Sequence, residues 1–321
     1  MVDRPQVYWV DTSLMSFDNS VAHKLNRLVE ESGATRELKQ GMRVALKVNT
    51  AEEGYEYGLR PVFVRAVADA VRQATETSPV VCDGLKLIDY WRKAKGHSFL
   101  DVSRGKGYTN QTVGGNFLIN GGYSGDEGNT YPCAVPDSVL GGVEVGTAIC
   151  RTDALFVLSH ITLHPLFGLS GALINGGFEC LVGRERARVL DGIDPYPFNG
   201  TRPAPEKLMA FSRRAIEGHM AVRAAMEDLV FYINYLWDVT PQPEYFPYSN
   251  APLVPNLGFL ASSDPVALDA ATYDCIAAST PGAAMEVNPV DEGTGVPFPE
   301  VLSAAQALGL GTAGYDLKRL S

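Results

Sequence analysis

Short apolar segments alternate with amphipathic ones through the first half of the chain, and this alternation constrains the fold more than any other feature. Residues 7–11, 43–49 and 79–84 have the length and apolar content of buried strands. Between them, apolar side chains recur at helical spacing in residues 21–29 and 61–71. Strands that alternate with helices form a largely parallel sheet. The sequence therefore predicts an α/β fold with a mostly parallel sheet, helices on both faces, and a smaller inserted or second lobe.

The second half is less regular. Residues 105–146 are rich in glycine and turn residues, which predicts short strands and hairpins or a long excursion over the site. A proline-rich stretch at 190–206 predicts a linker or a surface crossover. The predicted strands here are residues 154–158, 230–237 and 257–261, and the predicted helices are residues 170–180, 205–229, 264–278 and 301–308.

Composition and charge exclude several classes of protein. The 321 residues are 45% hydrophobic and 20% charged, as in compact soluble proteins. A formal charge of -10 argues against a nucleic-acid partner, although a small anion held by a few cations remains compatible. Residues 154–176, the most apolar stretch, contain histidines, a proline and glycines, so we expect no membrane partner. The first five residues lack a signal-peptide pattern, which predicts a cytoplasmic location.

The five cysteines are widely spaced and form no C-x-x-C pair. This spacing disfavours a disulfide framework, a zinc site and an iron–sulfur cluster.

Two of the five histidines, His160 and His164, lie four residues apart. Either a strand or a helix would place both imidazoles on one side of the segment. Such a pair can bind a divalent transition metal or act as acid and base near neutral pH, and it can equally be two hydrogen-bonded histidines at a strand end. The Gly-x-Ser-Gly segment that follows, with Ser170, can bind an anion or begin a helix, and Asn175 lies just beyond it.

Polar side chains occupy the predicted ends of two strands. Asn49 and Asp83 would lie on the rim where open α/β sheets bind ligands. Lys47 lies inside an apolar strand, which is costly unless its ammonium group has a partner. Arg60 precedes a predicted helix, and its guanidinium group suits a carboxylate or phosphate, although an ordinary surface arginine explains it too.

Two carboxylates belong to the predicted helix at 264–278. Asp264 precedes Pro265, as expected of a helix N-cap. Asp269 lies one turn further along. Either carboxylate could reach a site at that helix end or orient a histidine.

These segments, in this order, resemble the prokaryotic family called domain of unknown function 362. The resemblance implies one family domain over residues 1–321, with sub-lobes at 1–104 and 150–321 and a glycine-rich excursion at 105–149. The matching segments are residues 46–49, 60–71, 164–175, 230–240, 250–258, 262–269 and 308–311.

This chain departs from the family pattern at its cysteines and lysines. Many members carry a ferredoxin-like cysteine insert near residues 190–206 and a Cys-Asp-Cys near residues 244–246, and neither is present here, so no iron–sulfur cluster is expected. Three lysine positions of the family pattern hold His160, Thr162 and Ile174.

A more distant similarity links the chain to the nickel-pincer lactate racemases, in which a lysine tethers the cofactor. The matching residues are Arg60, Pro61, His164, Gly168, Ser170 and Gly171. Because Ile174 replaces the tethering lysine, a covalent nickel pincer is not expected.

Taken together, the residues and the resemblance predict an enzyme that acts on a small carboxylated or oxygenated metabolite. Isomerase, racemase or lyase chemistry is expected, with or without a metal. The alternatives are a metal-dependent redox or hydrolytic enzyme and a non-catalytic small-ligand binding protein, and a homo-oligomer is compatible with each. The candidate catalytic residues are His160, His164 and Asp269, the first two also being candidate metal ligands, and the candidate substrate-binding residues are Lys47, Asn49, Arg60, Asp83, Ser170, Asn175 and Asp264.

Overall fold

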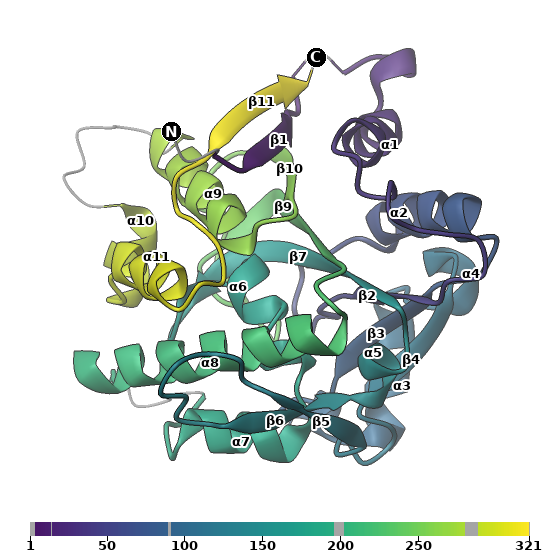
Figure 1. Ribbon diagram of the computed structural model, residues 1–321. Coiled ribbons are helices and arrows are strands. Elements are labelled where there is room, and N and C mark those ends of the chain that lie inside the picture. Colours follow the sequence, from purple (N-terminus) through teal and green to yellow (C-terminus); the bar gives the residue numbers. More distant parts are fainter. Residues whose placement is uncertain (1–3, 14, 89–90, 196–201, 280–287, 321) are drawn as a thin grey trace.

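A mixed sheet runs through the middle of the computed structural model, which describes residues 4–13, 15–88, 91–195, 202–279 and 288–320 (Figure 1). Its strands follow the order β11-β1-β10-β9-β7-β2-β3-β4, and β8 pairs with β7 outside that path. The strands are β1 (Gln6–Val10), β2 (Val44–Lys47), β3 (Val80–Gly84), β4 (Asn116–Asn120), β7 (Ala154–His164), β8 (Gly168–Leu169), β9 (Val230–Thr240), β10 (Gly258–Ser262) and β11 (Asp316–Leu320).

Most neighbouring strands in the sheet are parallel. The strands β4, β3, β2, β7 and β9 form a continuous parallel set. β10 is antiparallel both to β9 and to β1, and β11 pairs parallel with β1. These pairings confirm the predicted α/β fold with a mostly parallel sheet.

Helices cover both faces of the sheet (Figure 1). On one face, Leu25 of α1 and Val64 of α2 pack in a core with Leu46 and Phe156 of the sheet. On the other face, helices α6, α8, α9 and α11 enclose a second core that includes Val157. The helices are α1 (Val21–Glu31), α2 (Pro61–Thr75), α3 (Gly96–Gly105), α4 (Asn110–Val113), α5 (Thr147–Cys150), α6 (Ala172–Asn175), α7 (Gly183–Leu190), α8 (Pro205–Ala225), α9 (Pro265–Ser279), α10 (Pro289–Thr294) and α11 (Phe298–Ala307), with 3-10 turns η1 (Phe17–Asn19), η2 (Arg92–Ala94) and η3 (Phe178–Cys180).

The glycine-rich residues 105–149 form short elements, as predicted. After α4, β4 joins the edge of the main sheet. The strands β5 (Gly128–Pro132) and β6 (Gly142–Gly146) then form a separate antiparallel pair that packs near α8. Residues 196–201 of the predicted linker lie outside the described residues.

The structure differs from the prediction between residues 154 and 180. The predicted strand 154–158 continues to His164, because the longer β9 pairs with it and β8 folds back on it. The predicted helix 170–180 is interrupted: α6 ends at Asn175 and a 3-10 turn follows. Gly176 and Gly177 pack so closely against α8 that a Cβ on Gly176 would approach the His219 ring to 2.7 Å. Close packing at this glycine pair, rather than a continuous helix, therefore shapes the segment.

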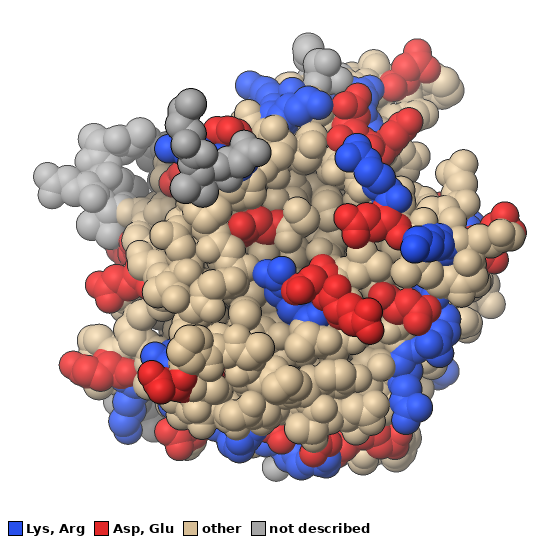
Figure 2. Space-filling view, in the orientation of Figure 1, with Lys and Arg blue, Asp and Glu red and all other residues tan. Residues whose placement is uncertain are grey.

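The surface carries both signs of charge. On the face in Figure 2, Lys and Arg side chains alternate with Asp and Glu, and its described part shows no continuous basic patch. None of the described helices combines the length and apolar character needed to cross a bilayer.

His219 connects α8 to two neighbouring elements inside the second core. Its Nδ1 donates a hydrogen bond to the Leu173 carbonyl at 2.9 Å, so Nε2 accepts one from the Tyr232 hydroxyl at 2.7 Å. Burial lowers the pKa of this imidazole to about 3. The ring is therefore neutral wherever the protein is folded at ordinary pH.

We predict that His219 makes the fold sensitive to acid. In the unfolded chain the imidazole titrates near its usual pKa of about 6.5, so below that pH the unfolded state binds a proton that the folded state excludes. Stability is fully present above pH 6.5 and falls as pH falls toward 3. Between pH 5.5 and 4.5 the wild-type protein should lose about 1 kcal/mol more unfolding free energy than His219→Gln, as measured by urea denaturation. Equal losses in both proteins would contradict this role.

Candidate functional site

The candidate site lies at the carboxyl edge of the parallel strands. From β2 the chain proceeds through β3 and β4 in one direction, whereas β7, β9 and β10 extend the sheet in the other. The order therefore reverses between β2 and β7, and open α/β sheets bind ligands outside the carboxyl ends of strands at such a point. Lys47 ends β2, Asp83 lies near the end of β3 and His164 ends β7.

A buried carboxylate, Asp83, is surrounded by three buried lysines. The ammonium groups lie 3.5 Å (Lys47), 3.4 Å (Lys86) and 2.9 Å (Lys93) from its oxygens. The Thr50 backbone N–H and hydroxyl each donate to Asp83 Oδ2 at 2.9 Å. Burial alone would raise the pKa of Asp83, but the three cations outweigh it and hold that pKa well below its usual range. Asp83 is thus the shared counter-ion of the group.

The buried lysines differ in how many carboxylates lie near their ammonium groups. Lys86 lies between Asp83 and Glu179, and although burial opposes its charge, these two carboxylates raise its pKa. Lys93 also donates to the Thr50 carbonyl and hydroxyl, and its ammonium lies 4.6 Å from the Phe99 ring centroid. Burial lowers the pKa of Lys93 to about 8.

A second group of charges adjoins the first. The Glu179 carboxylate lies 3.3 Å from Lys86 Nζ and 3.7 Å from Arg186 Nη1. Burial opposes its ionisation, yet these cations lower the pKa of Glu179 to about 2. Arg186 also donates to the Leu85 carbonyl. Its Nε, although buried, has no hydrogen-bond partner among the described residues.

The formal charges of this cluster do not cancel. Among the described side chains, the cations Lys47, Lys86, Lys93 and Arg186 face the carboxylates of Asp83, Glu179 and buried Glu52, which accepts a hydrogen bond from the Lys93 backbone. Four positive groups against three negative ones leave one positive charge. Because a buried charge is costly without a partner, this excess favours an added anion.

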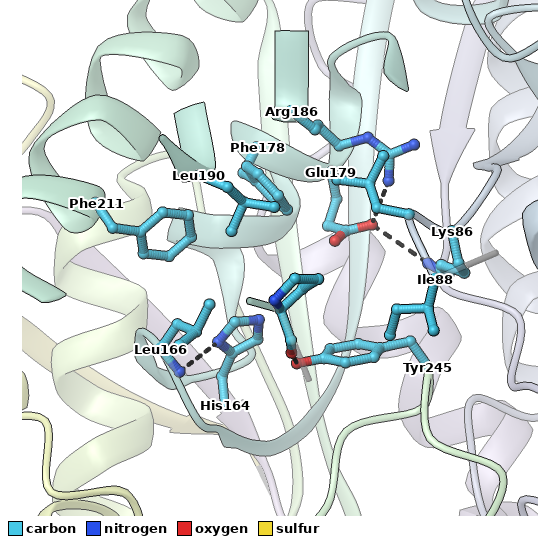
Figure 3. Close-up of a pocket in the computed structure, with 12 residues that line it drawn as sticks. Lys86, Ile88, His164, Leu166, Phe178, Glu179, Arg186, Leu190, Phe211 and Tyr245 are labelled. Carbon is cyan, nitrogen blue, oxygen red and sulfur yellow. Dashed lines mark hydrogen bonds and ion pairs between the residues drawn. The ribbon is translucent and has the colours of Figure 1, made fainter. Parts of the chain in front are cut away.

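A pocket opens beside this cluster, and Lys86, Glu179 and Arg186 form its charged end (Figure 3). The cavity is narrow, with a volume of about 30 Å³, which is room for roughly two water molecules. The remaining lining residues are Leu87, Ile88, His164, Leu166, Phe178, Leu190, Pro195, Phe211 and Tyr245.

His164 presents one ring nitrogen to the pocket. Its Nδ1 accepts a hydrogen bond from the Leu166 backbone N–H at 3.3 Å, so the proton of the neutral ring is on Nε2. Figure 3 shows the second nitrogen turned away from Leu166, toward the interior of the pocket. Burial lowers the pKa of His164 to about 4, so the ring is neutral at pH 7. The centroid of the Tyr245 ring lies 5.8 Å away.

His160 has a different environment. Its Nδ1 lies 3.0 Å from Glu244 Oε1, and its Nε2 lies 2.8 Å from the Trp237 carbonyl oxygen. Both partners only accept hydrogen bonds, so both nitrogens carry hydrogen and the ring is an imidazolium. Burial alone would lower its pKa, but the Glu244 carboxylate outweighs that and raises it.

The two imidazoles therefore have different hydrogen-bond partners, and both nitrogens of His160 are engaged. The register shift here lies in β9, which advances from Tyr235 to Thr240 while β7 advances only from His160 to Thr162. This bulge of β9 brings the Trp237 and Asp238 carbonyls to His160 Nε2. Within the described residues, no group of three or more His, Cys, Asp or Glu side chains is placed to hold a metal ion. His160 fastens the segment after β9 to β7, whereas His164 faces the pocket.

Several other sequence-predicted residues adjoin the cluster. Lys47 Nζ donates to Asn49 Oδ1 at 2.5 Å, and Asn49 Nδ2 donates to Asn175 Oδ1 at 2.7 Å. Ser170 is buried next to β7, where its backbone N–H donates to the Thr162 carbonyl. These residues join the loop after β2 to the segment after β7, behind the pocket wall.

Asp269 forms its hydrogen bonds with groups other than the two candidate histidines. Its oxygens accept hydrogen bonds from the backbone N–H groups of Ala172 and Leu173 at 2.8 and 2.9 Å, and from Asn234. A Cβ on Gly171 would come within 2.3 Å of the carboxylate. This close approach explains that glycine of the Gly-x-Ser-Gly segment, with Asp269 capping α6. Burial raises the pKa of Asp269 to about 6.

Asp264 and Arg60 also lie outside the pocket. Because β10 is antiparallel to its neighbours, Asp264 follows it at the opposite edge of the sheet, where it caps α9 and accepts a hydrogen bond from the Thr312 N–H. Arg60 pairs with Asp238 at 3.0 Å, and its guanidinium lies 5.2 Å from the Trp237 ring centroid. Arg60 borders a separate hollow near the start of α2.

Sequence reasoning did not identify the residues that form the pocket's charged end. Lys86 follows Asp83 just after the end of β3. Because ligands bind at the carboxyl ends of strands in open α/β sheets, the reasoning that identified Asp83 also applies to Lys86. Glu179 and Arg186 carried no comparable signal, because the irregular segment after α6 brings them to this position. Tyr245 lies in the loop after β9.

We predict that Asp83 is essential for stability. Asp83→Asn leaves three buried ammonium groups without their shared carboxylate, and breaking a buried ion pair on one side costs about 3–5 kcal/mol. Asp101→Asn is the matched control, because it breaks an exposed pair with Arg104 and should cost under about 1 kcal/mol. Urea denaturation at pH 7 measures both. A loss for Asp83→Asn as small as the control's would show that the lysines are not held as described.

Comparison with solved structures finds distant similarities. The lactate racemase apoprotein from Thermoanaerobacterium thermosaccharolyticum is 14% identical with a TM-score of 0.39, and the alignment covers 66% of this chain and 48% of that one. A structural-genomics protein from Thermotoga maritima is 16% identical with a TM-score of 0.38, over 77% of this chain and 56% of that one. The chain thus spans about half the length of either. A search of curated proteins finds no significant match.

Comparison with family models gives a clear result. The model described as "Domain of unknown function (DUF362)" matches residues 44–274, which is well over half of the chain. The match includes β2, β3, β7 and β9, and therefore the strands whose carboxyl ends border the site. It confirms the resemblance found in the sequence: the chain belongs to the DUF362 family.

Proposed function

We propose that this protein is an enzyme that acts on a small carboxylated metabolite by proton-transfer chemistry of the isomerase, racemase or lyase type. The observation that carries the proposal is the pocket beside β3 and β7, which has an excess positive charge at one end and a neutral histidine in its wall. Lys86 and Arg186 would hold the substrate carboxylate. The Nε2–H of His164 would donate a hydrogen bond to the substrate oxygen on which negative charge develops.

Reactions of this type share one electrostatic requirement. Removing a proton next to a carboxyl or carbonyl group, or expelling a β-substituent, places negative charge on an oxygen in the transition state. A neutral imidazole that is fixed as a donor can stabilise such an oxygen without adding a full charge. His164 meets this description, because the Leu166 N–H fixes its tautomer and burial keeps it neutral.

Other residues have supporting roles in this proposal. The low pKa of Glu179 makes it a poor base near neutral pH, so it serves as the counter-ion that positions Lys86 and Arg186. Asp83 holds Lys86 from behind. His160 contributes by holding the segment that carries Glu244 and Tyr245.

The metal-dependent alternative has less support from the geometry. Both nitrogens of His160 are engaged, so this ring would have to break its hydrogen bonds before it could bind a metal with His164. A non-catalytic binding protein could use the same pocket. A binding protein would bind the carboxylate without converting it, whereas the proposed enzyme would form product.

We predict that His164→Phe abolishes turnover. The test incubates the protein in D₂O with a panel of small 2-hydroxy, 3-hydroxy, 2-oxo and unsaturated carboxylates, and follows deuterium incorporation and product formation by NMR. For a turned-over acid, removing the imidazole should lower the rate at least 100-fold, because loss of one hydrogen-bond donor to a developing oxyanion typically costs about 10²–10³. His97→Gln, which changes an exposed histidine on α3, should retain the wild-type rate.

Two outcomes would count against this assignment. Unchanged turnover by a folded His164→Phe protein would remove His164 from the chemistry. Tight binding of carboxylates without exchange or product across the whole panel would favour the binding-protein alternative.

A further inference from the structure

We propose that the pocket selects monocarboxylates that carry a short apolar chain, and that it disfavours dicarboxylates and phosphate esters. This inference rests on the proposed function and names the substrate class for the same pocket. Three features support it: the net charge of the buried cluster, the chemistry of the pocket wall and the size of the cavity.

The charge of the cluster fits a monoanion. The four buried cations and three buried carboxylates around Asp83 and Glu179 leave one positive charge among the described side chains. One carboxylate neutralises it. A phosphate monoester or a dicarboxylate adds about two negative charges at neutral pH, and the second would be buried without a partner.

The rest of the pocket is suited to hydrocarbon. Away from the charged end, most of its wall is apolar, with contributions from the loop after β3, from η3 and from helices α7 and α8. In Figure 3, Leu166, Leu190 and Phe211 lie across the interior from the Lys86 ammonium, whereas Ile88 lies beside it. The apolar side chains of the wall are Ile88, Leu166, Phe178, Leu190 and Phe211. A second charged group placed among them would lose its hydration without gaining a cation.

The size of the cavity limits the chain. At about 30 Å³ it holds roughly two waters, which a carboxylate group can replace. Longer chains must displace side chains of the pocket wall, among them Ile88 of the loop after β3 and Leu190 of α7. Affinity should therefore rise over the first few methylenes and then stop rising.

The test measures dissociation constants by ligand-observed NMR titration at pH 7 for acetate, propanoate, butanoate, hexanoate and octanoate. Butanamide, succinate and methyl phosphate are the chemical controls. Each methylene from acetate to butanoate should tighten binding roughly fourfold, the gain expected for burying one CH₂ group. Butanamide and succinate should each bind at least tenfold more weakly than butanoate.

Ile88→Ala tests whether this pocket sets the chain length. Removing the outer carbons of that side chain enlarges the cavity beside the charged end (Figure 3), so the optimum should move to a chain longer by one or two methylenes. Leu118→Ala is the control, because Leu118 is a half-exposed side chain on β4 outside the pocket, and it should leave the optimum unchanged.

The outcomes separate this inference from the proposed function. Succinate or butanamide binding as tightly as butanoate, or an optimum that Ile88→Ala does not move, would overturn the selectivity. If a dicarboxylate were turned over with dependence on His164, the proposed function would stand and this inference would fail. If no carboxylate bound and none was turned over, both would fail.

Discussion

The compensation of three buried lysines by Asp83 is the interaction on which the site depends. Each ammonium group is out of water, and a buried charge persists only where partners offset its lost hydration. Asp83 supplies that offset from the end of β3, while Thr50 donates two hydrogen bonds to the same carboxylate. The ends of β2 and β3 and the loops that follow them are held together by this one group. The position of Lys86 in the pocket follows from it.

The direction of the strands decides which polar residues meet. β2, β3, β7 and β9 are parallel, so the residues that follow them gather at one edge, beside the reversal of strand order. β10 is antiparallel, so its carboxyl end and Asp264 lie at the other edge. The resemblance led us to expect lysines at three positions that hold His160, Thr162 and Ile174. The site is nevertheless rich in cations. Lys86 and Arg186 supply them from the loop after β3 and from α7.

Much of the architecture could be predicted because periodicity in the sequence reflects burial directly. The parallel strands, the helices α2, α8 and α9, and the rim positions of Asn49 and Asp83 follow from such patterns. The strand at 154–158 was predicted too short, because its last residues gain their order from pairing with β8 and β9. Lys47, Asn49 and Asp83 lie close together, as expected for residues at the carboxyl ends of parallel strands. Glu179 and Arg186 reach the pocket through packing of the segment after Gly177, which no local pattern shows.

The pairing expected for His160 and His164 shows a further limit of sequence reasoning. A spacing of four residues can place two side chains on one face of a strand, but it does not determine their partners. The bulge of β9 opposite His160 brings the Trp237 carbonyl to that ring alone. The same spacing therefore gives a buried imidazolium that fastens a loop and a neutral imidazole in a pocket wall. Their different partners, Glu244 and the Leu166 N–H, determine those two states.

The proposed function requires that the charged end of the pocket bind a carboxylate. A crystal structure of the protein with butanoate tests it most directly. We expect the carboxylate within hydrogen-bonding distance of Lys86 Nζ or an Arg186 nitrogen, with the chain directed toward Phe178 and Phe211. Butanoate bound elsewhere, or bound with its carboxylate away from both cations, would contradict the account.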